Sequence, residues 1–317
     1  MINSKFSNDN VPVVLAFTPD YFVPAATCIF SILTSSRPSD RFHFICLLTQ
    51  PLQESYKDKL GRLAEGRAKF SYINLDGALP EIYVDQKYTI AASYRLLLPA
   101  ILTSLQKVLY VDCDMIFRNN LADLYRMTEI GDYYMAGVFE ATLEFQKPYL
   151  STIGCKAGEY INSGMLLMNL RALREDNMVE KLLDAAKEDH LQFPDQDVIN
   201  QLCQGRIMGL QPYWNSIRTF WLPQYKPDFL KYYTLKDWKY IQDRGNIHYT
   251  GAKPWNTFTV GFDVWWYHFK QLPKDIREMM DFPKGLYPLA SFYGSRIGKG
   301  LIDGARKLNR YIKTKKV

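Results

Sequence analysis

The chain has 317 residues, of which 47% are hydrophobic, 15% aromatic and 23% charged. This composition is typical of a packed globular protein, and it excludes a disordered, collagenous or coiled-coil chain. Lys and Arg total 39 against 33 Asp and Glu, which gives a formal net charge of +6. The length allows one large domain or two small ones, with a sizeable core.

The positive charge is concentrated at the C-terminal end of the chain. From Ser291 to Val317 there are eight Lys and Arg residues and one acidic residue, Asp303, so this segment has a net charge of +7. The remaining 290 residues have a net charge of −1. An acidic partner, such as an anionic membrane or a nucleic acid, would therefore bind this C-terminal tail, residues 291–317, and not the rest of the chain.

The cysteines and the N-terminus favour a reducing compartment. The five cysteines are widely spaced, with no CxxC pair and no Cys/His cluster at zinc-ligand spacing, so we expect neither a disulfide framework nor a structural zinc. The residues before Val11 lack the pattern of a signal peptide, and no apolar run approaches the length of a membrane span. We therefore expect a cytoplasmic protein.

Strands and helices alternate through the first hundred residues. Short apolar runs predict buried strands at 11–17, 42–48 and 70–73. Apolar residues at helical spacing predict one helix after the loop 18–22 and another at 52–63. This alternation predicts an α/β domain with a mainly parallel sheet.

The second part of the chain continues this pattern. The further predicted elements are a helix at 91–105 that bends near Pro99, strands at 107–111, 135–139 and 164–170, a helix at 178–190, and short strands near Ile207 and Ile247. No repeat, linker or change in composition occurs before about residue 285. We therefore expect one domain over residues 1–285, followed by a separate segment at 286–317.

Two Asp-x-Asp triplets could hold a cation. Asp112 and Asp114 directly follow the predicted strand 107–111, and ligands of open α/β sheets bind beyond the carboxyl ends of strands. Two adjacent carboxylates repel each other unless a cation lies between them, and Mg²⁺ or Mn²⁺ suits such oxygen ligands. The alternative is a solvated acidic turn. The second triplet, Asp195 and Asp197, precedes a predicted helix, and one of its residues could be only an N-cap.

Other polar residues could complete such a site. His248 could add an imidazole ligand, Gly251 would let the backbone approach a ligand closely, and Lys253 could neutralise a phosphate. The alternative for His248 is a buried structural histidine. Asn162, Ser163 and Gly164 form a polar stretch at the start of the predicted strand 164–170. The alternative is that these three residues form only a turn.

These motifs, in this order, resemble glycosyltransferase family 8, whose retaining enzymes include bacterial lipopolysaccharide galactosyl- and glucosyltransferases and, more distantly, glycogenin. The resemblance runs from Val13 to about Trp255. Its markers are the first strand with Tyr21, SYRL at 93–96, KVLYVDCDMIF at 107–117, YINSGMLLMNL at 160–170, DQDVIN at 195–200 and HYTGAKPW at 248–255.

The resemblance implies a GT-A fold that binds a nucleotide sugar and a divalent metal. By position, the implied metal ligands are Asp112, Asp114 and His248. The metal would in turn bind the diphosphate of the donor. The implied donor contacts are Gly251 and Lys253 at the diphosphate, Ala16, Thr18 and Tyr21 at the uridine, and Arg95, Asp112, Asn162, Asp195 and Gln196 around the sugar and its phosphate. Thr18 stands where family members often carry an acidic residue, and the stretch 251–253 is one residue shorter than in some relatives.

The expected reaction determines the catalytic candidates. Cleavage at the anomeric carbon leaves a charged diphosphate, which a divalent cation and a lysine would stabilise. Retention ordinarily calls for a carboxylate nucleophile on the opposite face of the sugar, but the family position offers Gln196, a poor nucleophile. We therefore favour front-face attack, with Asp195 or Asp197 as candidates for a covalent route. The aromatic residues Tyr213, Trp214, Phe220 and Trp221 could stack on acceptor sugars or belong to the core.

The basic tail has its own apolar pattern. Ile297, Leu301, Ala305, Leu308 and Ile312 recur at helical spacing between Arg and Lys residues. Such a basic amphipathic helix can lie on an anionic membrane surface. The alternatives are a solvated terminal helix and a nucleic-acid patch, and the apolar residues favour the membrane.

The sequence thus predicts a metal-dependent retaining hexosyltransferase that moves glucose or galactose from UDP to a cell-envelope glycan, such as lipopolysaccharide core, at the inner face of the membrane. One alternative is a sugar-nucleotide nucleotidyltransferase, which would be expected to carry a glycine-rich, basic loop where this chain has Thr18 to Phe22. The other is a non-enzymatic protein that binds membrane surfaces. The choice between glucose and galactose depends on one hydroxyl configuration, and the motifs do not determine it.

Overall fold

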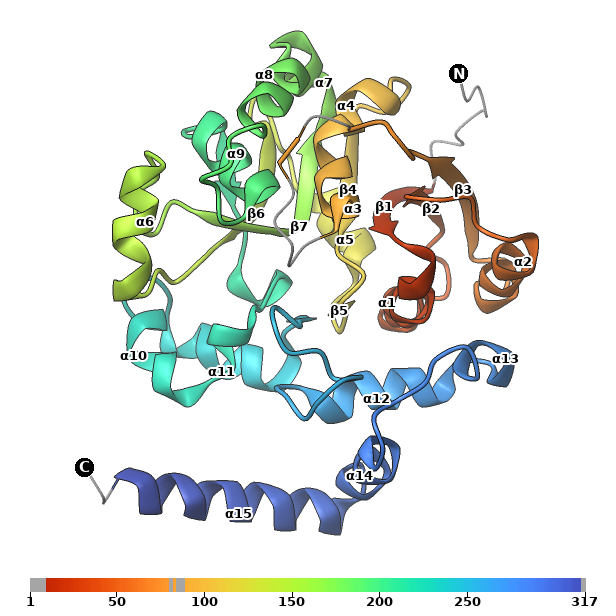
Figure 1. The fold of residues 1–317 in the computed structure, drawn as a ribbon, viewed down its shortest axis with the longest axis vertical. Helices are drawn as coiled ribbons and strands as arrows, with labels where there is room; N and C mark the ends of the chain where they lie inside the picture. The colour runs from red at the N-terminus through yellow and green to blue at the C-terminus, as the bar shows by residue number, and fades with distance from the viewer. Residues whose placement is uncertain (1–9, 80–81, 84–88, 315–317) are drawn as a thin grey trace.

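The fold is a layered α/β arrangement in which helices cover both faces of a central sheet (Figure 1). The computed structural model describes residues 10–79, 82–83 and 89–314, with side chains described as far as residue 305. Within these residues, seven strands form the main sheet in the order β3-β2-β1-β4-β7-β6-β8.

The main sheet is mixed and mainly parallel, as predicted. Its strands are β1 (Val11–Phe17), β2 (Phe42–Leu48), β3 (Ala68–Asn74), β4 (Lys107–Val111), β6 (Met135–Phe139), β7 (Ile161–Asn169) and β8 (Ile207–Gly209). Neighbouring strands run parallel except that β7 is antiparallel to both β4 and β6. The predicted strands 11–17, 42–48, 107–111 and 135–139 are confirmed at both ends.

The strands are apolar throughout because helices pack on both faces of the sheet. In β1, Val13 and Leu15 point into one core and Val14 into the other. The first core lies beneath α1 (Phe22–Ser35), α2 (Glu54–Leu63), α12 (Phe262–Gln271) and α14 (Leu286–Tyr293). The second lies beneath α4 (Leu98–Ile101), α7 (Leu170–Glu175), α8 (Met178–Ala185) and α9 (Pro194–Leu202).

Strand pairing brings distant segments to one edge of the sheet. Because β7 is antiparallel to β4, its first residues lie beside the end of β4, where the Asp112 amide donates to the Gly164 carbonyl at 2.7 Å. A small second sheet pairs β5 (Met115–Ile116) with β9 (Ile247–His248), and Met115 lies opposite His248. These pairings place residues near positions 112, 164 and 248 together.

Several predicted boundaries were wrong. The region 91–105 forms α3 (Ile90–Ser93), a 3-10 turn (Tyr94–Leu97) and α4, which ends because Leu102 leaves the helical conformation with φ −106° and ψ 54°. The helix predicted at 178–190 ends at Ala185. The polar residues Asn162 to Gly164 belong to β7 and do not form a turn.

The alternative for the triplet at 195–197, that one of its residues is only an N-cap, does not hold. Phe193 is the N-cap of α9, Pro194 occupies the first turn, and Asp195, Gln196 and Asp197 lie inside the helix. Acidic side chains in a first turn are favoured by the positive end of the helix dipole. Helix α9 packs on β7, where Gln196 and Asn200 accept hydrogen bonds from the Ser163 and Ile161 backbone N–H groups.

The remaining α-helices are α5 (Leu121–Met127), α6 (Lys147–Thr152), α10 (Lys226–Phe229), α11 (Leu235–Arg244), α13 (Lys274–Arg277) and α15 (Arg296–Thr314). Of these, α10, α11 and α15 lie below the sheet in Figure 1, and α6 lies at its left side. A third, small core gathers Phe220, Phe229, Trp238 and Ile241. Of the four aromatic residues left open above, Phe220 is therefore a core residue, whereas Tyr213, Trp214 and Trp221 are half-buried.

The C-terminal segment consists of a packed helix and an extended one. In α14, Leu286, Ala290 and Tyr293 are buried against the first core. Helix α15 then runs along the edge of the molecule (Figure 1), and it is held at its start by a 2.5 Å ion pair between Lys299 and Asp263. The side chains of Leu308 and Ile312 lie outside the described residues. The division at residue 285 stays a prediction.

Candidate active site

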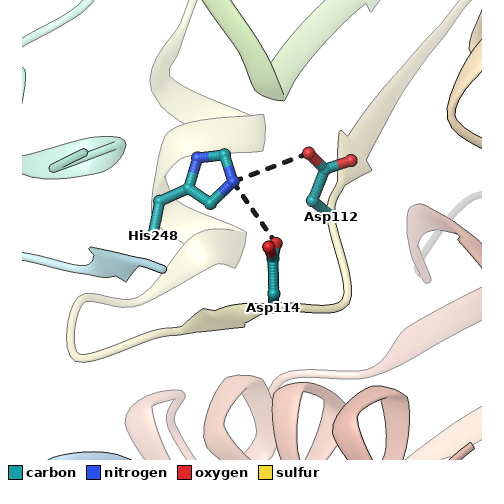
Figure 2. A group of neighbouring side chains, drawn as sticks. All are labelled: Asp112, Asp114 and His248. Atoms are coloured by element: carbon teal, nitrogen blue, oxygen red, sulfur yellow. Dashed lines mark ion pairs between the residues drawn. The ribbon is translucent and has the colours of Figure 1, made fainter. Parts of the chain in front are cut away.

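Three side chains predicted as metal ligands converge at the carboxyl end of β4. Asp112 follows β4, Asp114 precedes β5 and His248 ends β9. The His248 Nε2 lies 3.3 Å from Asp114 Oδ1 and 3.6 Å from Asp112 Oδ2, as the dashed lines in Figure 2 show. One ligand atom from each residue lies within 4.8 Å of the others. Two carboxylates and one imidazole form a donor set suited to Mn²⁺ and Mg²⁺.

Asp114 carries a feature that fits a bound cation. This residue is only 9% exposed, and its Oδ1 is a buried oxygen that accepts no hydrogen bond within the part of the chain that the structure describes. Burial opposes its ionisation, but Lys253 and His248 hold the pKa of the Asp114 carboxyl well below its usual range. Asp114 is therefore an anion at neutral pH, and one of its oxygens faces the other two ligands.

Asp112 is oriented by its second oxygen. Asp112 Oδ1 accepts hydrogen bonds from Arg95 Nη2 and from the Tyr110 hydroxyl, each at 3.0 Å. Oδ2 is left to face His248. Tyr110 also lies beneath the Arg95 guanidinium, which is 4.3 Å from the ring centroid. The buried pair of Arg95 and Tyr110 therefore fixes which oxygen of Asp112 points into the site.

Arg95 links two acidic residues of the site. Its Nη2 pairs with Asp112 and its Nε lies 3.0 Å from Asp195 Oδ2, while the side chain is 2% exposed. Burial alone would lower the pKa of Arg95, but Asp112 and Asp195 raise it overall. Burial raises the pKa of Asp195, and Arg95 opposes this shift. Arg95 therefore remains a cation between two carboxylates.

Lys253, predicted to contact a diphosphate, lies beside the metal-ligand cluster. Its Nζ pairs with Asp114 Oδ2 and donates to the Tyr249 carbonyl at 2.8 Å. The side chain is half-buried, so the ammonium remains within reach of an incoming anion. Gly251, in the same loop, is exposed and has φ +81°, a conformation that L side chains rarely adopt.

The lack of a side chain at Gly164 makes room for His248 and Asp112. A Cβ built on Gly164 would collide with His248 Cε1 and would lie 2.7 Å from His248 Nδ1 and 2.9 Å from Asp112 Oδ2. No side chain larger than hydrogen fits there unless His248 or Asp112 moves. The glycine of the predicted motif is therefore a steric requirement of the site.

The amide of Gln196 is held on a fixed framework beside the cluster. Its Oε1 accepts from the Ser163 backbone N–H at 3.0 Å and from Asn162 Nδ2 at 3.1 Å. Its Nε2 donates to the Tyr160 hydroxyl at 3.0 Å. Gln196, Asn162 and Asp195 are each 8% to 9% exposed. The structure therefore brings together three of the residues predicted around the donor sugar.

Asp197 is not brought to this site. It is 0% exposed, and its carboxylate accepts hydrogen bonds from the hydroxyls of Tyr149 and Tyr160 and from the Phe193 backbone N–H. Burial raises the pKa of Asp197, while these donors oppose that shift. These bonds tie the start of α9 to its surroundings. The role of Asp197 as a candidate nucleophile stays a prediction.

The residues predicted at the uridine lie where β1 ends, on the same edge of the sheet. Ala16 and Thr18 are half-buried, and the Ala16 carbonyl lies 3.6 Å from the Cys113 sulfur. Tyr21 packs edge-on against Trp255 with ring centroids 5.6 Å apart. Burial and the nearby Asp114 raise the pKa of Tyr21, so its hydroxyl stays protonated.

Two residues of the site were missed from the sequence. Glu140 is half-buried, and its Oε1 lies 3.4 Å from Asn162 Nδ2 and 3.5 Å from Gln196 Nε2. Burial raises the pKa of Glu140. Its position directly after a predicted strand, like that of Asp112, was a signal for it. Asn215, which contacts His248 at 3.0 Å, lies in an aromatic loop that carried no such signal.

Comparison with known proteins gives a consistent result. Residues 12–259 match the family model described as glycosyl transferase family 8. The lipopolysaccharide 1,2-glucosyltransferase of Escherichia coli K12 is 25% identical over 284 residues, which span 84% of this chain and 81% of that protein.

Two solved structures share the fold. A galactosyltransferase LgtC structure with donor and acceptor sugar analogues matches with a TM-score of 0.69 and 23% identity, over 85% of this chain and 100% of LgtC. The bifunctional glycosyltransferase WbbM matches with a TM-score of 0.72 and 20% identity, over 88% of this chain. This chain spans 53% of WbbM, about half of its length. These likenesses confirm the predicted GT-A fold.

Proposed function

This chain belongs to glycosyl transferase family 8, and we propose that it is a retaining hexosyltransferase that uses UDP-glucose or UDP-galactose as its donor. The observation that carries the proposal is the cluster of Asp112, Asp114 and His248 at the carboxyl end of β4. Its donor atoms suit the cation that accompanies a sugar diphosphate. The family membership argues against a nucleotidyltransferase.

The residues around the cluster have distinct roles in this proposal. A Mn²⁺ or Mg²⁺ ion held by Asp112, Asp114 and His248 would offset the negative charge that develops on the diphosphate leaving group. Lys253 would exchange its contact with Asp114 for one with the diphosphate and add a second positive charge. Gly251 and the residues Ala16, Thr18 and Tyr21 would accommodate the diphosphate and the uridine.

On the sugar side, Gln196 would position the donor rather than attack it. Its carbonyl oxygen already accepts three hydrogen bonds, and a neutral amide is a poor nucleophile. Asp195 is paired with Arg95, which lowers its tendency to form a bond to carbon. We therefore favour front-face attack, in which the leaving phosphate takes the proton of the acceptor hydroxyl.

The proposed acceptor is a cell-envelope glycan such as lipopolysaccharide core. Support comes from the E. coli relative that is named a lipopolysaccharide 1,2-glucosyltransferase and that matches over 84% of this chain. Such an acceptor is a glycolipid, so an enzyme acting on it would work at the cytoplasmic face of a membrane. Tyr213, Trp214 and Trp221, which are half-buried, are candidates for stacking on acceptor sugars.

A donor panel tests the proposal. UDP release should be measured with UDP-glucose, UDP-galactose, UDP-N-acetylglucosamine, ADP-glucose and GDP-mannose, each in the presence of Mn²⁺. We expect turnover with UDP-glucose or UDP-galactose and little with donors that carry another base. Turnover of none of the UDP-hexoses, or a preference for a donor with a purine base, would overturn the donor assignment.

We also propose that α15 lies on an anionic membrane surface. In its described part, Ile297 and Leu301 are 75% and 62% exposed, four residues apart and therefore on one face of the helix. The charge of the tail complements anionic lipid headgroups. No helix within the described residues combines the length and the apolar character needed to cross a bilayer.

Removal of residues 296–317 tests this proposal and leaves the packed helix α14 in place. The full chain is expected to sediment with vesicles that contain phosphatidylglycerol and not with neutral vesicles. The shortened chain is expected to lose this binding and to keep its rate of UDP release. Vesicle binding that survives the truncation, or a tail that binds DNA with a steep salt dependence and ignores the vesicles, would refute the proposal.

A further inference from the structure

We propose that Asn215 is a positioning residue that presents the unprotonated Nε2 of His248 to the cation. The inference rests on the proposed metal-dependent function and names a residue outside the three ligands. Asn215 follows a 3-10 turn (Pro212–Trp214) and is 0% exposed. Its side chain lies between His248 and Asn162, and it makes hydrogen bonds to both.

The orientation of the Asn215 amide is fixed by a group that can only accept hydrogen bonds. Its Nδ2 lies 3.2 Å from the backbone carbonyl of Asn162 and 2.9 Å from Asn162 Oδ1. Asn162 Oδ1 is itself identified as the oxygen, because it accepts the Gly164 backbone N–H at 3.1 Å. A carbonyl facing a carbonyl would leave both without a donor, so the NH₂ group must face Asn162.

The oxygen of Asn215 must then face His248. Asn215 Oδ1 lies 3.0 Å from His248 Nδ1, and an oxygen acceptor requires a proton on that nitrogen. A ring that binds a metal is neutral and has one N–H, so in that form the N–H is at Nδ1 and Nε2 carries the lone pair. Nε2 is the atom that lies 3.3 Å from Asp114 Oδ1, an oxygen that accepts no hydrogen bond from the described residues. Together with Asp112 Oδ2, these two atoms give three lone pairs close to one another, an arrangement that suits a cation.

The backbone around Asn215 holds this geometry in place. The Asn246 N–H donates to the Tyr213 carbonyl at 2.9 Å, and the His248 N–H donates to the Ser216 carbonyl at 3.1 Å. These two bonds connect the loop on either side of Asn215 to β9. On the side away from His248, Asn162 Nδ2 donates a hydrogen bond to Gln196 Oε1 at 3.1 Å. Asn215 thus connects the metal-ligand cluster to the residue proposed to position the donor sugar.

The tautomer can be tested on the unaltered protein. Two-bond ¹H–¹⁵N spectra of the metal-free full chain distinguish the two neutral tautomers, and the chain has four histidines. His248→Gln identifies the signals of residue 248. We expect an N–H at Nδ1 and a lone pair at Nε2. A neutral ring with its N–H at Nε2 and its lone pair at Nδ1 would overturn the proposal, whether or not the protein turns over a UDP-sugar.

Three variants test the consequence for metal binding, read by electron paramagnetic resonance titration with Mn²⁺ alone. Asn215→Ala is expected to weaken Mn²⁺ binding roughly 10- to 100-fold, as loss of a residue that orients a metal ligand typically does. Asn215→Asp keeps an oxygen toward Nδ1 but sets its second oxygen against the two oxygens of Asn162, so it is expected to recover only part of that affinity. Asn169→Ala, a buried asparagine at the other end of β7, is the matched control and should bind Mn²⁺ normally.

The outcomes separate this inference from the proposed function. Equal Mn²⁺ affinity in Asn215→Ala and the wild type would show that Asn215 does not position the ligand. An equal loss of affinity in Asn169→Ala would show a general effect of lost stability, and it would equally overturn the proposal. A wild-type protein that binds no Mn²⁺ would refute the metal site itself, and the tautomer measurement would still decide the role of Asn215.

Discussion

Asp114→Asn is expected to lower UDP-sugar turnover roughly 10²- to 10³-fold, the usual effect of removing one group that stabilises developing negative charge. The substitution keeps the size of the side chain and removes the charge that faces both His248 and Lys253. It leaves a weaker ligand for the cation and leaves Lys253 without its carboxylate partner. The measurement is the rate of UDP release as a function of Mn²⁺ concentration.

Asp58→Asn serves as the control for this substitution. Asp58 is an exposed residue on α2, so the same chemical change there should leave turnover unchanged. The metal assignment fails if Asp114→Asn turns over UDP-sugar as fast as the wild type does. It also fails if EDTA has no effect on the wild type.

Gly164→Ala is expected to lower turnover about 100-fold, because it displaces reacting groups by a distance on the order of 1 Å. The added methyl group would occupy the space beside His248 Cε1 and Asp112 Oδ2. Mn²⁺ affinity should fall with turnover, and overpacking should cost roughly 1–3 kcal/mol in the free energy of unfolding. Manganese titration and urea denaturation measure the two effects.

Gly137→Ala is a matched control on the neighbouring strand β6. A Cβ there would lie 3.0 Å from Ile161 Cδ1 and 3.2 Å from Leu166 Cδ2, which are apolar atoms away from the metal ligands. This variant should lose stability and keep its Mn²⁺ affinity. If Gly164→Ala binds Mn²⁺ as the wild type does, the close packing around His248 has no functional consequence.

The strands were the most predictable part of the fold. Because both faces of the sheet are covered, β1, β2 and β4 are apolar at nearly every position, and their boundaries follow from where this pattern stops. The short elements between 90 and 101 were not predictable in this way. Their turns alternate between two helical forms, and both forms place apolar residues at similar spacing.

The metal-ligand cluster was predictable in part. Asp112 and Asp114 are marked by the strand that precedes them, whereas the proximity of His248 depends on the pairing of Met115 with His248 across 133 positions of the chain. Family resemblance supplied this contact, and local sequence pattern alone did not. The pairing of β4 with β7 similarly explains why a glycine is required at 164.

The residues that hold the ligands were harder to predict. Asn215 lies among aromatic residues, and only the folded geometry shows its contact with His248. The two carboxylates of the DxD triplet at 195–197 differ in a way that the sequence does not reveal, because Asp195 pairs with Arg95 and Asp197 accepts from Tyr149 and Tyr160. Sequence pattern indicates which residues can do chemistry, whereas the partners of each side chain become visible only in the fold.

The central claim is that Asp112, Asp114 and His248 hold a divalent cation that binds the donor diphosphate. Electron paramagnetic resonance titration of the wild-type chain with Mn²⁺, with and without UDP, tests it most directly. We expect one Mn²⁺ site per chain, which UDP tightens and which Asp112→Asn weakens. Absence of Mn²⁺ binding, or binding that neither UDP nor Asp112→Asn alters, would contradict the claim.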